Sequence, residues 1–490
     1  MGIREIKLFI DGKYCDGSDG GTFDSINPAN RQIVARVASG TAADVNRAVE
    51  SAAKAFPEWS EMPGERRGKI LRTAAELLRK RAEEFAKWET LDVGKPISDT
   101  RNLDLPVSIN FLEWYGGVAL DFCGETIPIG NPEQIDYTVR QPYGVVGLIA
   151  PWNFPLVTAI LKIGPALAVG NTAIMKPATW TPITTLLLGE VFSEAGLPPG
   201  VLNIIAGSGS VVGEAISAHP KIGKIFFTGS TEVGQKIMIV AASNVTDTSM
   251  ELGGKSPNII FADAEWEQAL SGATFGILMN NGQNCIAGSR LLVEKQIYTK
   301  FTAALAKRFK AIRVGDPLKE STQLGPVVSA GHYETVMKYI ELGRSEGATV
   351  LCGGSHVAGP ECASGYYIEP TIFTDVSNKM RIAQEEIFGP VLVAIPFSGE
   401  DEAVCIANDS KYGLGSGVFS TDVGKVHRVL RRLHAGTVYV NTYNMVYPQA
   451  PFPAWKQSGN SAERGHHGLL ENTRYKNIIM DVSGKAIPWG

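Results

Sequence analysis

The feature that most constrains the fold is a regular alternation of strand-like and helix-like segments that begins near Gly144. Short apolar runs rich in Val and Ile are each followed by a longer segment with helical periodicity and a Gly or Pro boundary. Strands and helices that alternate in this way form right-handed βαβ units, so we expect a parallel sheet covered by helices on both faces. The predicted strands are 144–150, 172–176, 201–206 and 224–228, and the predicted helices are 155–169, 183–195, 211–218 and 231–242.

A second alternation follows Glu251 and predicts a second α/β unit. Upstream of both units, residues 43–57 have the pattern of an amphipathic helix that ends at Pro57, and residues 64–93 have the pattern of one long helix. In the second unit, the predicted strands are 257–261, 289–294, 391–397, 416–419 and 436–441, and the predicted helices are 266–279, 299–309 and 332–345.

Two segments fit neither unit. Residues 125–141 alternate apolar and polar side chains, and residues 476–482 form a short β-like run in the C-terminal tail. Because a strand leaves unpaired backbone groups at its edges, this tail strand needs a partner. It is either an ordinary edge strand or an arm that bridges subunits.

Length and composition exclude several classes of protein. A chain of 490 residues is too long for one core, so two or three domains are expected at about 100–200 residues each. The net charge is −4 and no segment concentrates Lys and Arg, which gives no support for binding to nucleic acid or to a membrane surface. No apolar run approaches the roughly 18–20 residues that span a bilayer, and the N-terminus lacks a signal-like apolar core. We therefore expect a cytoplasmic protein.

The six cysteines show neither a CxxC pair nor metal-ligand spacing, so we expect free thiols and no metal site. Cys285 stands out because it lies in the Gly- and Asn-rich loop 281–290, and glycines let a backbone approach a ligand closely. A buried structural thiol is the ordinary alternative. The residues alone leave a Cys/His hydrolase open but unattractive, because no histidine lies in a Gly-rich or motif-like setting except the pair His466 and His467 near the C-terminus.

Glu251 is a second candidate, in the segment Met250–Ser256 at the join between the two α/β units. Beside two glycines, its carboxylate could point into a cleft between the units, and partial burial would raise its pKa toward the range of a general base. A solvated surface carboxylate is the alternative.

Taken together, these segments resemble the aldehyde dehydrogenase superfamily, whose signatures include Glu-Leu-Gly-Gly-Lys-Ser and Gly-Gln-x-Cys. Glu251 precedes Cys285 by 34 residues (285 − 251), as in that family. The six segments that carry the resemblance occur in the family's order and spacing, and they are 151–155, 176–178, 227–234, 251–256, 282–285 and 385–391.

The resemblance implies an enzyme that oxidises an aldehyde to a carboxylic acid with NAD or NADP. Cys285 would attack the aldehyde carbon, and the Asn153 amide with the Cys285 N–H would stabilise the oxyanion. Glu251 would activate the water that hydrolyses the thioester. The resemblance counts Lys176 with both the catalytic and the cofactor residues. The other implied cofactor residues are Ile149, Pro151, Trp152, Thr179, Gly209, Gly213, Phe227, Gly229, Ser230, Val233, Leu252, Glu386 and Phe388.

Two departures from the family affect cofactor and substrate. Many members have Glu where this chain has Thr179, and a carboxylate there would repel a 2′-phosphate, so NADP is expected to be accepted; an unchanged preference for NAD is the alternative. Pro453 and Ala454 replace two glycines of a loop at the substrate entrance. The residues implied to line the substrate path are mostly apolar, without a clear Arg, and predict an apolar medium-chain or aromatic aldehyde: Val118, Phe154, Leu161, Asn284, Ile286, Val446 and Phe452.

The resemblance also implies the fold class, an α/β protein with a Rossmann-like cofactor domain, a second α/β catalytic domain and a small β oligomerisation arm. The expected boundaries are 1–124 with 142–250 for the cofactor domain, 251–450 for the catalytic domain, and 125–141 with 473–490 for the arm. A homodimer or homotetramer is expected. Two other functions stay open, namely acyl transfer to coenzyme A and a catalytically silent binding protein on the same fold.

Overall fold

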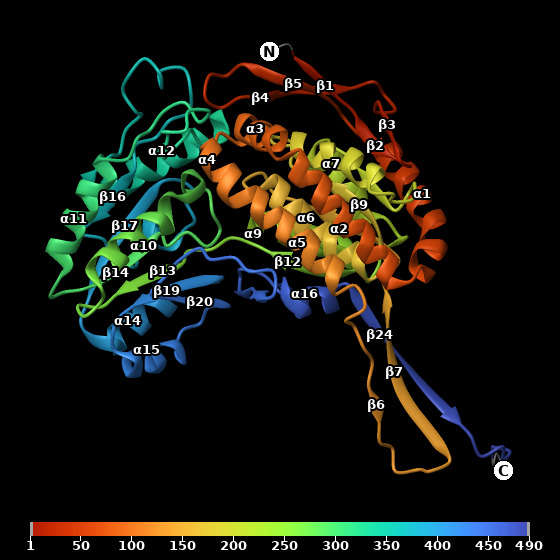
Figure 1. The fold of residues 1–490 in the computed structure, drawn as a ribbon. Coiled ribbons are helices and arrows are strands. Elements are labelled where there is room, and N and C mark those ends of the chain that lie inside the picture. The colour runs from red at the N-terminus through yellow and green to blue at the C-terminus, as the bar shows by residue number, and fades with distance from the viewer. Residues whose placement is uncertain (1–2, 488–490) are drawn as a thin grey trace.

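The computed structural model describes residues 3–487 (Figure 1). Two seven-stranded sheets, each covered by helices, form the body of the molecule, and a long β arm projects away from it. This is the α/β architecture with a β arm that the sequence predicts. Among the helices of the described residues, none is both long and apolar enough to cross a membrane.

The first sheet has the strand order β12-β11-β8-β9-β10-β2-β3, in which β8 to β12 run parallel, β2 pairs antiparallel with β10, and β3 pairs antiparallel with β2. From β8 the chain proceeds outward through β9 and β10, and then returns to the other side of β8 with β11 and β12. This reversal between β8 and β11 creates a crevice at the carboxyl ends of the strands, where doubly wound sheets bind ligands. The strands are β2 (Leu8–Ile10), β3 (Lys13–Cys15), β8 (Val145–Ile149), β9 (Thr172–Lys176), β10 (Leu202–Ile204), β11 (Ile222–Thr228) and β12 (Asp247–Glu251).

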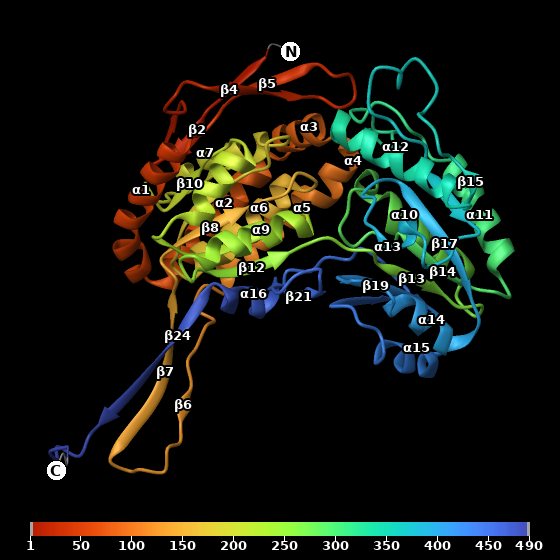
Figure 2. The ribbon, with the colours of Figure 1, turned by 180° about the vertical axis from the view of Figure 1, so that it is seen from behind.

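Helices cover both faces of this sheet (Figure 2). The two helices that follow β8 and β9 pack with the N-terminal helices on one face, and those that follow β10 and β11 pack with α1 on the other. The first face carries α2 (Gly64–Lys80), α3 (Ala82–Val93), α5 (Leu105–Gly117), α6 (Pro155–Ala168) and α7 (Ile183–Glu194), and the second carries α1 (Ala42–Glu61), the π-helical turn η2 (Gly209–Gly213), α8 (Glu214–Ala218) and α9 (Thr231–Ala242).

The second sheet has the order β15-β16-β17-β14-β13-β19-β20, with only the edge strand β15 antiparallel. Separate apolar clusters lie on its two faces, one under α10 and α11 and the other under α12, α14 and α15. The strands are β13 (Pro257–Ile260), β14 (Arg290–Glu294), β15 (Thr349–Cys352), β16 (Thr371–Thr374), β17 (Val391–Phe397), β19 (Gly415–Phe419) and β20 (Thr437–Val440). The helices are α10 (Trp266–Leu278), the 3₁₀ turn η3 (Met279–Gly282), α11 (Tyr298–Lys310), α12 (Ala330–Ser345), α13 (Arg381–Gln384), α14 (Gly399–Asn408) and α15 (Val423–Leu430).

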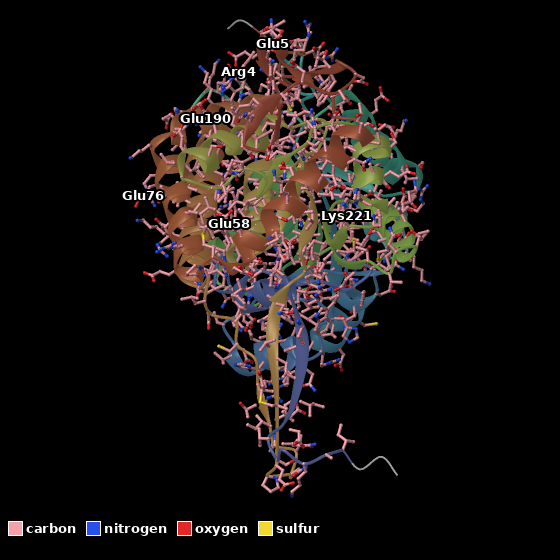
Figure 3. All side chains as sticks on the ribbon, turned by 90° about the vertical axis from the view of Figure 1, so that its right-hand side faces the viewer. Arg4, Glu5, Glu58, Glu76, Glu190 and Lys221 are labelled. Atoms are coloured by element: carbon pink, nitrogen blue, oxygen red, sulfur yellow. The ribbon has the colours of Figure 1, made fainter. Side chains whose placement is uncertain are left out.

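The arm consists of β6 (Thr126–Ile127), β7 (Gln134–Pro142) and the C-terminal strand β24 (Thr473–Asp481). Strand β24 pairs antiparallel with β7 along its whole length, from Thr473 opposite Pro142 to Asp481 opposite Gln134. The partner that the tail strand requires therefore comes from the same chain. Figure 3 shows the arm extending below the body, far from surface residues such as Glu76 and Glu190.

Smaller elements complete the fold, including a three-stranded N-terminal sheet with the order β1-β5-β4. These elements are β1 (Arg4–Ile6), β4 (Thr22–Ile26), β5 (Ile33–Ala38), α4 (Ile97–Asp99), the π-helical turn η1 (Thr100–Asp104), β18 (Tyr412–Gly413), β21 (Phe452–Pro453), β22 (Trp455–Lys456), β23 (Ala462–Glu463) and α16 (Gly465–Glu471).

The structure corrects two helix boundaries. Helix α1 continues through Pro57 to Glu61, because a proline in the last turns removes one N–H donor while Trp59 beyond it is fully buried in the core. The segment predicted as one helix over 64–93 is two helices that meet at Arg81, which has a non-helical backbone (φ −102°, ψ 16°).

Candidate active site

A single cleft of about 1100 Å³ lies where the carboxyl ends of β8, β9, β11 and β12 face the loops that precede β14 and β17. Every site residue expected from the sequence lines this cleft except Val118. Val118 is the C-cap residue of α5, and it packs against the first hydrophobic core instead of reaching the cleft. Residues far apart in the sequence therefore converge on one cavity.

The turn before Cys285 has an unusual backbone. Asn280, Asn281 and Gly282 are three consecutive residues with positive φ, at 55°, 59° and 74°. Asn tolerates this left-handed region better than most residues that have a Cβ. The Asn281 side chain holds the turn in place, because it donates to Gly94 O (3.1 Å) and Pro326 O (2.8 Å) and accepts from Gly325 N (2.7 Å).

Asn153 is joined to the same loop by two hydrogen bonds. Its Nδ2 donates to Gln283 O at 2.8 Å, and its backbone carbonyl accepts from Asn280 Nδ2 at 2.8 Å. The Asn153 amide has a second N–H, which has no acceptor among the described residues. An amide donor is therefore held beside the cysteine loop with one hydrogen free.

The Cys285 side chain is half-buried in the cleft and packs with the apolar residues Ile286 and Phe452. Burial, together with the nearby carboxyl groups of Glu386 and Glu251, raises the pKa of the Cys285 thiol to about 12. The thiol is therefore protonated near neutral pH and needs a base before it can act as a nucleophile.

Glu251 ends strand β12, and its side chain is buried. Burial and the neighbouring Glu463 carboxylate raise the pKa of Glu251 well above its ordinary value. One carboxyl oxygen accepts a 2.5 Å hydrogen bond from Ser461, and the other has no hydrogen-bond partner within the described part of the chain. A buried carboxyl group with a raised pKa and a free oxygen is suited to proton transfer.

The two glycines after Glu251 permit close contact between the two halves of the molecule. A Cβ atom at Gly253 would overlap the Glu386 carboxylate, and one at Gly254 would overlap the backbone carbonyl oxygen of Cys285. The sequence Glu-Leu-Gly-Gly therefore brings Glu251, the cysteine loop and Glu386 into one site.

At the other end of the cleft, Lys176 and Ser230 offer the hydrogen-bond donors that a dinucleotide needs. The Lys176 ammonium is buried and donates only to Pro177 O (3.0 Å) among the described residues, and burial lowers its pKa to about 8. Ser230 is the N-cap of α9, whose free backbone N–H groups and dipole favour an anion such as a phosphate. Buried donors and a helix N-terminus thus fit a ribose and a pyrophosphate.

Glu386 and Phe388 also line the cleft. One Glu386 oxygen accepts from Gly254 N at 2.9 Å, and burial raises the pKa of this carboxyl to about 7. Phe388 has a positive φ of 61°, which is strained for a bulky side chain. Two contacts hold it, because the Trp152 ring packs edge-on at 5.1 Å and His332 Nε2 lies 2.7 Å from the Phe388 carbonyl oxygen.

Several residues that line the cleft were not expected from the sequence. They include His332 on α12, Glu463 at the end of β23, and Arg464 between β23 and α16. Lys162, on the inward side of α6, forms an ion pair with Glu463 at 2.6 Å. These positions lie outside the motifs. For Glu463 and Arg464 the only signal was the presence of charged residues just beyond the segment Pro451–Gly459, which was too weak to assign a role, and His332 and Lys162 had no such signal.

Comparison with known proteins agrees with this geometry. The model of the aldehyde dehydrogenase family matches residues 14–478, and the chain belongs to this family. A protein of Bacillus subtilis (strain 168) named "Putative aldehyde dehydrogenase DhaS" is 44% identical over 480 residues, which cover 97% of this chain and 96% of that protein.

Two crystal structures of similar proteins contain the cofactor. Betaine aldehyde dehydrogenase (betB) from Staphylococcus aureus in complex with NAD+ is 40% identical, with a TM-score of 0.97 over 99% of this chain and 96% of that chain. PnpE in complex with nicotinamide adenine dinucleotide is also 40% identical, with a TM-score of 0.97 over 99% of both chains; a structure of PnpE from Pseudomonas sp. WBC-3 matches equally well in fold.

Proposed function

We propose that this enzyme oxidises an aldehyde to the carboxylic acid with NAD+ or NADP+, with Cys285 as the nucleophile and Glu251 as the general base. The observation that carries the proposal is the single cleft that contains Cys285, Glu251 and Asn153 together with Lys176 and Glu386. The NAD+ complexes of the two relatives support the choice of cofactor.

In the first step, the Cys285 Sγ forms a bond to the aldehyde carbon while its proton passes to Glu251. The aldehyde oxygen becomes negative and accepts hydrogen bonds from the free Asn153 N–H and the Cys285 backbone N–H. Loss of one such donor typically lowers a rate about 10²–10³-fold. Phe154, Leu161 and the other apolar side chains that line this end of the cleft exclude water from the oxyanion.

In the second step, hydride leaves the same carbon and an acyl thioester remains on Cys285. The cofactor supplies the hydride acceptor. Lys176 and Glu386 would hold its two riboses, and Ser230 with the first amides of α9 would hold its pyrophosphate. Glu251 releases the thiol proton to solvent and so returns to the carboxylate form. It then removes a proton from water, whose oxygen attacks the thioester carbon; the C–S bond breaks, the acid leaves and the Cys285 thiolate is reprotonated.

We further propose that both cofactors are accepted, because Thr179 presents no carboxylate to a 2′-phosphate. Its hydroxyl donates to Gly207 O at 2.9 Å and so has only acceptor capacity left for a ligand. The cleft also contains Lys236 and Glu214, so charges of both signs line it.

The substrate end supports an aldehyde with an apolar body. Phe154, Leu161, Ile286, Val446 and Phe452 line this part of the cleft. We also propose that the cytoplasmic enzyme is a homodimer or homotetramer, because β24 is exposed along almost its whole length on both faces.

The proposal is tested with a panel of aldehydes that vary in size, polarity and charge, monitored by NADH and NADPH absorbance and by product analysis with and without coenzyme A. We expect the free acid in both conditions. The Cys285→Ser variant should lose at least about 10³-fold in rate, as expected when a nucleophile is removed. The matched Cys405→Ser variant changes an exposed thiol outside the cleft and should keep full activity. If an acyl-coenzyme A product forms, the thioester is transferred to coenzyme A and is not hydrolysed. If no aldehyde is oxidised, the protein is a catalytically silent binding protein.

A further inference from the structure

Arg464 lies at the substrate end of the cleft, beside the nucleophile. It follows β23 and has a positive φ of 66°, which is uncommon for a residue with a Cβ. Its guanidinium carbon lies 4.2 Å from the centroid of the Phe452 ring, and Phe452 packs in the same small cluster as Ile286 and Cys285. An arginine is therefore held over the apolar wall that a substrate must pass.

The guanidinium of Arg464 has no partner among residues 3–487. It forms no ion pair and no side-chain hydrogen bond there, and its Nε is buried without an acceptor. The neighbouring cations differ in this respect, since Lys162 pairs with Glu463 at 2.6 Å and Lys95 with Asp104 at 2.6 Å. A buried donor without an acceptor costs free energy, so the site favours a ligand that supplies one.

The carboxyl groups that face Arg464 are already engaged. Glu463 pairs with Lys162, and Glu251 accepts from Ser461 while its other oxygen is needed for proton transfer. The guanidinium is therefore free to bind a group on the substrate. Arginine binds carboxylates through two parallel N–H···O bonds, a geometry that a lysine cannot reproduce.

We propose that the substrate is an aldehyde that carries a carboxylate, and that Arg464 binds this carboxylate while the aldehyde reaches Cys285. This inference rests on the proposed function and names the substrate class of the same site. The apolar walls then hold the carbon chain between the two polar ends.

Matched pairs of aldehydes test the proposal in the full-length enzyme with NAD+. The pairs are butanal with 4-oxobutanoate, hexanal with 6-oxohexanoate, and benzaldehyde with 4-formylbenzoate. For at least one pair, the wild-type kcat/KM should be about tenfold or more higher for the anionic member, because a buried charged partner discriminates strongly. Arg464→Leu should lower kcat/KM about 10²-fold for that anionic aldehyde and less than about threefold for its neutral partner.

Arg464→Lys should keep part of the kcat/KM that Arg464→Leu loses for the anionic aldehyde. Arg66→Leu removes an exposed arginine outside the cleft and should change kcat/KM for neither member of a pair. The proposal is overturned if the wild-type enzyme prefers the neutral member of every pair. It is also overturned if Arg464→Leu lowers kcat/KM equally for both members of a pair, because Arg464 would then act on the thiol or on the general base. If Arg464→Leu does not fold, the proposal is judged from the wild-type preference between the members of each pair and from kcat/KM of the Arg464→Lys variant. Oxidation of neutral aldehydes without preference for the carboxylate refutes this proposal alone, whereas no oxidation of any aldehyde refutes the proposed function as well.

Discussion

The two residues proposed to carry the chemistry are both held in an environment that opposes their charged forms. Burial raises the pKa of Cys285 to about 12 and raises the pKa of Glu251 well above its ordinary value. Each group therefore tends to be neutral in the free enzyme, and the carboxylate that forms at higher pH is a stronger base than an exposed glutamate.

A consequence is that activity should fall on the acid side at a higher pH than an ordinary glutamate would give. The active form of Glu251 is the carboxylate, so a raised pKa means that kcat is lost as pH falls through this raised value. Glu463→Gln removes a like charge that raises the pKa of Glu251, while Lys162, which lowers it, remains. The acid limb of the kcat profile should then move to lower pH. An unmoved limb would mean that another group controls it.

Cofactor choice is also decided at a single residue. Thr179→Glu should lower kcat/KM for NADP+ about 10²-fold relative to NAD+, because a carboxylate repels the 2′-phosphate at close range. The matched variant Thr179→Gln has the same length without the charge. Equal effects of Glu and Gln, or a wild-type preference for NAD+ beyond about a hundredfold, would contradict the role given to Thr179.

At the scale of elements, the turn before Cys285 joins the nucleophile loop to several distant segments. Asn281→Ala removes three hydrogen bonds and leaves the two carbonyl oxygens of Gly94 and Pro326 without their donor. We expect a fall in kcat of about 10²-fold with little change in cofactor affinity, because a small displacement of a reacting group costs this much. Rapid-mixing kinetics and cofactor titration measure the two effects.

Asn441→Ala is the matched control for this prediction, since Asn441 also has a positive φ (52°) and bonds Ser420, but does not line the cleft. Both variants should have a lower melting temperature than the wild type, and only Asn281→Ala should have a lower kcat. Equal kinetic effects would show that the loss comes from stability alone.

The same elements show what sequence reasoning can predict. The strands and helices that were predicted after Gly144 agree with the structure to within a few residues, because buried parallel strands and amphipathic helices leave clear periodic patterns. The elements β12, β15, β16, α14 and α15 were not predicted. The strands β1, β2 and β3 have three residues each, too few for a period to be visible. The left-handed turn at Asn280 could not be predicted either, because the Gly- and Asn-rich composition indicated a shaped loop but not its dihedral angles.

At the scale of the molecule, the site exists because the two sheets meet end to end. Cys285 and Glu386 precede strands of the second sheet, and Glu251 and Lys176 end strands of the first. Motif spacing predicted which residues share the cleft, since a family resemblance carries tertiary information. It gave no indication of Arg464, which lies outside the motifs and became a candidate only when its unpaired side chain was found in the cleft.

The β arm should control assembly. Ile479 on β24 is 65% exposed in the single chain, and Tyr475 on the same strand is 57% exposed, which is unusual for large apolar side chains in a long strand. Ile479→Asp should lower the mass measured by light scattering, because a buried unpaired charge would destabilise the interface. Lys476→Ala, on the same strand, should leave the mass unchanged. An unchanged mass for Ile479→Asp would place the contact elsewhere.

The pairing of β7 with β24 joins segments as much as 347 residues apart in the chain. During synthesis on the ribosome, β7 emerges early, and the edge that pairs with β24 stays open until β24 has been translated. An open strand edge can pair with the wrong chain. Chains that stop before β24 should therefore aggregate even when both α/β units have formed, and the synthesis of β24 acts as the signal that allows productive assembly.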